Sequence, residues 1–294
     1  MADRSEKSGK VRASFIDRGV HQAAEVISGA YLQWETASRK GWLQGLDARV
    51  KVFFLLYFVV VISLKRDILS EATIGIFVLA MAALSRIDFF LYLRRVLLLG
   101  FVFGFLVALP SALNVVRDGR IILPLFELPA SYTLWLYHIP RSIGLTLEGL
   151  SGVALLTLRV MNSLAVSLLV LFTTPFPEII RALKTIKVPD VVLVMLTLSY
   201  KYIFLFARTV EEMHLAKRSR YAGGDSGALG RNWIAGRVAF LFRRTQVRCE
   251  DVFKAMTARG FSEDIRLHGF NELALADWSA CLLFALAGAL FMAW

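Results

Sequence analysis

Six long apolar runs limit the possible folds of this chain more than any other feature of its sequence. A helix crosses the hydrocarbon core of a bilayer with about 20 apolar residues, and about 17 is the lower limit. The chain is 57% hydrophobic, whereas soluble domains contain roughly 45 to 50% apolar residues. The sequence therefore predicts an all-α integral membrane protein. The runs are Val52 to Leu64, Ile68 to Leu84, Val96 to Leu113, Leu150 to Phe172, Val188 to Phe206 and Leu273 to Trp294.

The first two runs are separated only by Lys65, Arg66 and Asp67. Such a short connection fits a tight transmembrane hairpin, in which the long side chains of Lys65 and Arg66 reach the interface. A re-entrant pair of helices is the alternative, because the first run is short for a crossing.

The distribution of Lys and Arg predicts the orientation, because loops on the cytoplasmic side are enriched in these residues. Residues 1–51 hold nine, the loop 85–95 holds three and the segment 174–276 holds sixteen. The 36-residue loop 114–149 holds only three. We therefore place the three basic segments in the cytoplasm and expect 114–149 to be an external, irregular loop. This pattern is the one expected of a multi-pass protein in a bacterial cytoplasmic (inner) membrane.

The number of membrane crossings then determines how the run 188–206 is interpreted. Four crossings from a cytoplasmic N-terminus return the chain to the cytoplasm at Thr173, so a crossing at 188–206 would place the most basic segment outside. We interpret 188–206 as a cytoplasmic or interfacial helix, and a sixth transmembrane helix, which hydropathy alone favours, is the alternative. The predicted fold has about five transmembrane helices and a cytoplasmic helical coupling domain inserted before the last one.

Four parts of the chain follow from this topology. In the N-terminal part, residues 1–50, apolar residues from Val20 to Trp34 recur at spacings of 4, 3, 4 and 3, as on one face of a helix at the membrane surface. The parts are a cytoplasmic arm with an interfacial helix (1–50), a four-helix membrane region (51–174), cytoplasmic coupling helices (175–271) and a last transmembrane helix (272–294).

The coupling part is expected to hold a short helix and two long ones. Pro175 and Pro177 end the preceding membrane helix, since proline cannot continue it. The expected helices are Pro177 to Ile186, Pro189 to Arg220 and Trp233 to Arg259, with a glycine-rich turn at 222–230 between the last two.

A short pattern occurs near the ends of both long helices, as Ala216-Lys-Arg-Ser219-Arg220 and as Ala255-Met-Thr-Ala258-Arg259. The two small residues of each copy lie on one helical face and let a partner approach closely, while the rigid guanidinium fork of the arginine reaches past them. Two equivalent docking points for two similar soluble partners explain the duplication. Alternatively, each arginine complements the C-terminus of its own helix.

Other chemistry finds little support. The chain has no Gly-x-x-x-x-Gly-Lys-Ser/Thr phosphate loop, so we expect no ATP hydrolysis by this chain alone. Its four histidines and two cysteines show no metal-ligand spacing, and no catalytic residue, metal or cofactor is predicted. The net charge of +11 fits contact with anionic membrane lipid and requires no nucleic acid. Arg159, inside an apolar run, has either a functional or a structural role in the membrane bundle.

The two arginine patterns, with Tyr221 after the first and Gly260 after the second, resemble the paired signatures of the transmembrane T component of energy-coupling factor (ECF) transporters. Similar elements elsewhere are Leu46 to Lys51 at the start of the first membrane helix, Glu148-Gly149, Arg159, Thr173-Thr174-Pro175 and Tyr200-Lys201-Tyr202. The likeness covers about residues 46–294. Ala48 stands where the family commonly has proline, and Tyr221 stands where it has a small residue.

This resemblance implies a non-catalytic scaffold that joins two ATP-binding cassette subunits to a substrate-binding membrane (S) component. In the family, the helix ends that carry the arginines insert into grooves on the ATPases. The implied cargo is cobalt, as in the CbiQ-like branch, or else nickel or a vitamin. Two alternatives are a self-contained secondary transporter and a lipid-modifying membrane enzyme. The transporter would require repeated halves with ionisable groups near the midplane of the membrane. The enzyme would require a cluster of carboxylates or histidines at the membrane interface.

Overall fold

The computed structural model describes residues 41–112, 120–127, 132–134, 137–139, 142–220, 227–261 and 273–293. The chain divides into two compact units, one formed by 33–186 with 270–294 and the other by 1–32 with 187–269. We call them the membrane unit and the coupling unit and describe each by itself. The interfacial helix predicted at Val20 to Trp34 lies outside the described residues.

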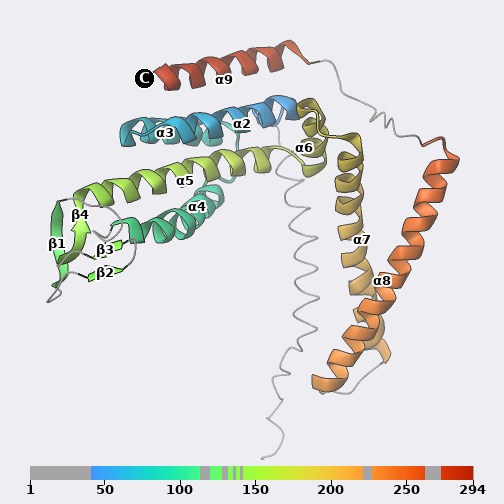
Figure 1. The fold of residues 1–294 in the computed structure, drawn as a ribbon. Helices are drawn as coiled ribbons and strands as arrows, with labels where there is room; N and C mark the ends of the chain where they lie inside the picture. The colour runs from blue at the N-terminus through green and yellow to red at the C-terminus, as the bar shows by residue number, and fades with distance from the viewer. Residues whose placement is uncertain are drawn as a thin grey trace, which may run out of the picture. The chain divides into compact units, whose positions relative to one another are not determined.

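Helices α2 (Ala48–Leu64) and α3 (Ile68–Leu84) form the first part of the membrane unit (Figure 1). The side chain of Asp47 caps α2 by accepting a hydrogen bond from the backbone nitrogen of Arg49 at 2.9 Å. The rings of Phe58 and Phe77 stack with their centroids 5.6 Å apart. The two helices therefore pack antiparallel around the connection 65–67, as expected of a hairpin.

The third apolar run forms a composite helix. It begins as α4 (Phe89–Leu99), continues as the π-helical segment η1 (Gly100–Leu106) and ends in the 3₁₀ turn η2 (Leu109–Ala112). Gly100 and Gly104 face α5, where an added β-carbon would lie 2.3 Å from the side chain of Met161 and 3.1 Å from the backbone of Thr157. The absence of side chains at these two glycines allows the backbones to approach closely.

Helix α5 (Leu147–Thr173) is the centre of the membrane unit and packs against α2, α3, α4 and η1. Helix α9 (Leu275–Ala293) packs on α2, where the rings of Phe54 and Phe284 lie 4.4 Å apart. After α5, the short helix α6 (Phe176–Leu183) and the turn η3 (Lys184–Ile186) lead out of the unit, and α6 packs on the start of α2. A common core of α2, α3, α4, α5 and α9 buries Phe58, Ile74, Tyr92, Val166 and Phe284, among others.

The loop 114–149 is more regular than predicted. Strand β1 (Ile121–Glu127) pairs antiparallel with β4 (Ser142–Thr146), and β2 (Tyr132–Leu134) pairs with β3 (Tyr137–Ile139). The expectation of an irregular loop was wrong because apolar β-forming residues in β1 find a ladder partner in β4 later in the sequence. The helical membrane class is nevertheless confirmed, since the described strands are confined to 121–146.

The coupling unit contains α7 (Asp190–Arg220) and α8 (Gly227–Ala258). Their ends at Arg220 and Ala258 agree with the prediction. Residues 227–230, predicted to be part of a turn, instead form the first turn of α8, because adding residues to a helix that has already nucleated costs far less than starting one. Among the residues that recur at spacings of three and four along α8, Leu241, Thr245, Val252 and Met256 are half-buried, whereas Val238 and Cys249 are exposed.

Four helical segments of the described chain are long and apolar enough to cross a membrane: Phe89–Leu106, Leu147–Thr173, Asp190–Lys217 and Leu275–Ala293. Helix α3 is apolar but shorter. Hydropathy thus admits α7 as a crossing, while the distribution of basic residues opposes it.

Cysteine labelling distinguishes these two topologies. In a variant that lacks Cys249 and Cys281, single cysteines at Asp190, Ala222 and Ser262 are expected to react with an impermeant thiol reagent only from the cytoplasmic side. The reason is that a crossing by α7 would export the basic segment that follows it. A cysteine at Ser131, in the loop predicted to be external, is the control and is expected to react only from the opposite side. Labelling of Asp190→Cys and Ser262→Cys from opposite sides would show that α7 crosses.

Candidate functional site

The first arginine signature forms the C-terminal end of α7. Ala216, Ser219 and Arg220 are all exposed, and Arg220 is the last residue of the helix. The hydroxyl of Ser219 donates to the carbonyl of Ala216 at 3.0 Å, so this side chain folds back on its own helix. Tyr221 lies outside the described residues. The structure therefore presents a small, open helix face followed by an exposed guanidinium.

The second signature ends α8 in a defined cap. The amide of Phe261 donates to the carbonyl of Met256 at 3.0 Å, and that of Gly260 donates to Thr257 at 3.0 Å. These two bonds form a Schellman motif, in which Gly260 adopts a φ of 80° that favours glycine. Arg259 therefore has a fixed backbone position at the helix end. Ala255, Ala258 and Arg259 are exposed.

The two arginines lie at opposite ends of the helix pair. Lys217, near the end of α7, places its ammonium 4.6 Å from the ring centre of Trp233, near the start of α8. Helix α8 then continues to Ala258, a length of about 48 Å for its 32 residues at 1.5 Å each (Figure 1). Neither arginine is in an ion pair with another described residue. The coupling unit thus carries two separate copies of one exposed feature.

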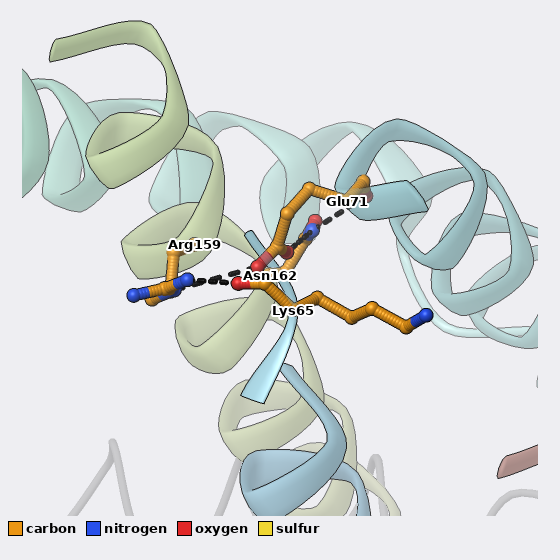
Figure 2. A network of polar contacts seen from close by, with 4 residues as sticks. All are labelled: Lys65, Glu71, Arg159 and Asn162. Atoms are coloured by element: carbon orange, nitrogen blue, oxygen red, sulfur yellow. Dashed lines mark hydrogen bonds and ion pairs between the residues drawn. The ribbon is translucent and has the colours of Figure 1, made fainter. Parts of the chain in front are cut away.

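A polar network joins α3 to α5 inside the membrane unit (Figure 2). The carboxylate of Glu71 is fully buried and lies 3.4 Å from Nε of Arg159. The side-chain amide of Asn162 donates to the other oxygen of this carboxylate at 2.9 Å and to the backbone carbonyl of Glu71 at 2.7 Å. A buried carboxylate requires such a partner and such hydrogen bonds to be tolerated. Arg159, the intramembrane residue identified from sequence, therefore has its carboxylate partner on α3.

The same arginine also holds the tip of the hairpin. Nη2 of Arg159 donates to the backbone carbonyl of Lys65, just beyond the end of α2. The side chain of Lys65 in turn reaches the carbonyl of Met292 near the end of α9, at 3.5 Å. The network connects α2, α3, α5 and α9 at this level. Glu71 and Asn162 were missed from sequence, although a glutamate inside an apolar run is a recognisable signal.

A second polar cluster surrounds the start of α2. Lys51 is 1% exposed, and its ammonium donates to the carbonyls of Thr173 at 3.1 Å and Gln44 at 3.5 Å. The carboxylate of Asp277 accepts from the backbone nitrogens of Asp47 at 2.8 Å and Ala274 at 3.0 Å. The ends of three helices thus meet around residues 44–51. Sequence reasoning noted this stretch only as part of a family resemblance and did not identify its partners.

Metal-ligating side chains do not gather in the described part of the chain. No group of three or more His, Cys, Asp or Glu residues there is placed to hold a metal ion. The geometry offers helix ends and buried polar contacts as the features with which a function can be built.

Comparison with known proteins connects these features to a family. The sequence pattern of the family described as CbiQ, cobalt transport protein, matches residues 39–268. The chain belongs to the CbiQ family. The match includes Lys51, the Glu71 and Arg159 pair and both arginine signatures, and α9 lies beyond it.

Two curated relatives come from Methanocaldococcus jannaschii. The protein MJ1571 is 29% identical over 248 residues, which are 84% of this chain and 80% of the relative. The protein MJ1089 is 28% identical over 142 residues, 48% of this chain and 47% of the relative. Both are described as uncharacterized, so the CbiQ family supplies the functional description: a membrane component for transport of the cobalt type.

Proposed function

We propose that this protein is the energy-coupling transmembrane scaffold of an ECF-type importer. It links two cytoplasmic ATP-binding cassette subunits to a substrate-binding membrane component in the cytoplasmic membrane. The single observation that supports this most is the pair of exposed arginine-bearing helix ends, at Arg220 and Arg259, on opposite ends of the helix pair α7 and α8. One scaffold that binds two similar partners needs two similar, separated contacts.

The chemistry of these ends suits a protein groove. Alanine or serine at 216, 219, 255 and 258 leaves room for a partner backbone along the last helical turn. The guanidinium that follows presents five donors in a rigid plane, which matches a carboxylate or a set of carbonyls. In this proposal Tyr221 and Gly260 line the two contacts as well. The fixed cap of α8 keeps Arg259 in place before binding, which lowers the entropic cost of docking.

Cobalt ion is the proposed cargo, and the CbiQ family description supports it. In an ECF-type importer the substrate site belongs to the substrate-binding component, so the cargo is tested with the assembled complex. Competition of radiolabelled Co²⁺ uptake by unlabelled Co²⁺, but not by Ni²⁺ or a vitamin, is the result expected of a cobalt importer.

The purified chain alone is expected to show no ATP hydrolysis above background, because it lacks a phosphate loop. Added to its partner ATPases in lipid vesicles, it is expected to change their hydrolysis rate. The matched control is the Arg220→Ala, Arg259→Ala variant, which should leave that rate at the level of the ATPases alone. Sustained turnover by the isolated chain would contradict the scaffold role.

A further inference from the structure

Residues 44–51 contact both of the other stretches of the membrane unit through which the chain leads to or from the coupling unit. The chain passes between the units at residues 32/33, 186/187 and 269/270. The first connection leads into Gln44 and Asp47, the second leaves from the end of α5 through α6, and the third leads into Ala274 and α9. These three stretches are held together within the membrane unit, because the second and the third each form hydrogen bonds with residues 44–51 of the first.

Lys51 connects the first and second of these stretches of chain. Thr173 is the last residue of α5, and its carbonyl is one of the acceptors that a helix leaves without an internal partner. The buried ammonium of Lys51 donates to this carbonyl across 122 residues of sequence. A cation at this position also interacts favourably with the negative end of the helix dipole.

Asp277 connects the first and third of these stretches of chain. One carboxylate oxygen accepts from the amide of Asp47 and the other from the amide of Ala274, immediately before α9. This side chain is 7% exposed, so the two bonds are largely shielded from water. A carboxylate with both oxygens engaged by separate backbone segments fixes the distance between them.

We propose that Lys51 and Asp277 are positioning residues that transmit movement of the coupling unit to the membrane helices. This inference rests on the proposed coupling function. Movement of the coupling unit can reach the membrane unit along the chain only through the three stretches that these two side chains connect. With the connection intact, α2, α5 and α9 move as one body. Without this connection, each stretch responds separately, and ATP hydrolysis is no longer converted into rearrangement of the membrane helices.

The test uses the complete complex in lipid vesicles, with its ATPases and substrate-binding component. It measures Co²⁺ taken up per ATP hydrolysed for Lys51→Met and Asp277→Asn. Both variants are expected to retain the ATPases and to hydrolyse ATP while the ratio falls about tenfold, within the range of ordinary coupling energies. A variant that was merely less stable would lower uptake and hydrolysis together and leave the ratio unchanged. The control is Arg94→Met, which removes an exposed cation on α4 and should leave the ratio unaltered.

A second measurement is independent of the cargo. Cys249 is free and exposed on α8, and a cysteine at Arg66 supplies a label at the hairpin tip in a variant that lacks Cys281. ATP is expected to change the energy transfer between these labels, and Lys51→Met or Asp277→Asn should abolish that change. Unaltered uptake per ATP and an unaltered ATP response in both variants would overturn the inference and leave the scaffold role intact. Failure of the unmutated chain to retain ATPases would instead overturn the proposed function.

Discussion

The Arg220→Ala, Arg259→Ala double variant is expected to lose assembly with the ATPases almost completely while it still inserts into the membrane. Truncation of an arginine in a desolvated groove leaves its partner groups unpaired, at a cost of roughly 2 to 5 kcal/mol or about 30-fold to several thousand-fold in affinity. Two linked contacts reinforce each other through their effective concentration, so loss of both is far more damaging than loss of one. The measurement is the yield of ATPase subunits retained on the tagged chain, together with ATP-dependent uptake.

Single variants make this prediction sharper. Arg259→Lys is expected to restore binding only in part, because lysine supplies charge without the planar fork. Arg220→Ala is expected to act on the other docking site, less strongly because Tyr221 follows it. The control is Arg208→Ala on the same helix α7, whose guanidinium lies 3.1 Å from Glu212 in an exposed pair. Such a pair contributes only about 0 to 1 kcal/mol, so this variant should bind normally. Normal assembly and uptake by the double variant would show that these helix ends are not the docking contacts.

Arg159→Met is expected to destabilise the membrane unit by about 3 to 5 kcal/mol, the typical cost of leaving one member of a buried ion pair without its partner. Glu71 would remain fully buried without a cation, and the carbonyl of Lys65 would lose its donor at the hairpin tip. Thermal unfolding of the detergent-purified protein measures the effect.

A double-mutant cycle separates the ion pair from other losses. Glu71→Gln in the Arg159→Met background removes the buried charge and keeps an oxygen that can accept from Asn162, so it should recover part of the stability. The control is Arg94→Ala, an exposed position on α4 that should change stability little. Equal stability of Arg159→Met and the unmutated protein would contradict a structural role for this network.

Local sequence patterns predicted the helical elements well. The run Ile68 to Leu84 coincides with α3, and the arginine signature at Arg220 ends α7 as expected. Hydropathy, charge, proline and glycine act over a few residues, so they can be interpreted without knowing what lies next to them. The two errors have different causes: β1 becomes a strand through pairing with the distant strand β4, whereas residues 227–230 become helical as an extension of the adjoining helix α8.

The polar contacts of the membrane unit were decided by tertiary structure. Arg159 was recognised as unusual from sequence, but its partner Glu71 is 88 residues away. The contacts from Lys51 to Thr173 and from Asp47 to Asp277 span 122 and 230 residues. The sequence by itself determined that the chain forms apolar helices and that two long helices end near Arg220 and Arg259, because these features depend on neighbouring residues. Only the packing of the helices determined which buried charges meet, because a buried charge is tolerated wherever the fold brings it a partner, whatever their separation along the chain.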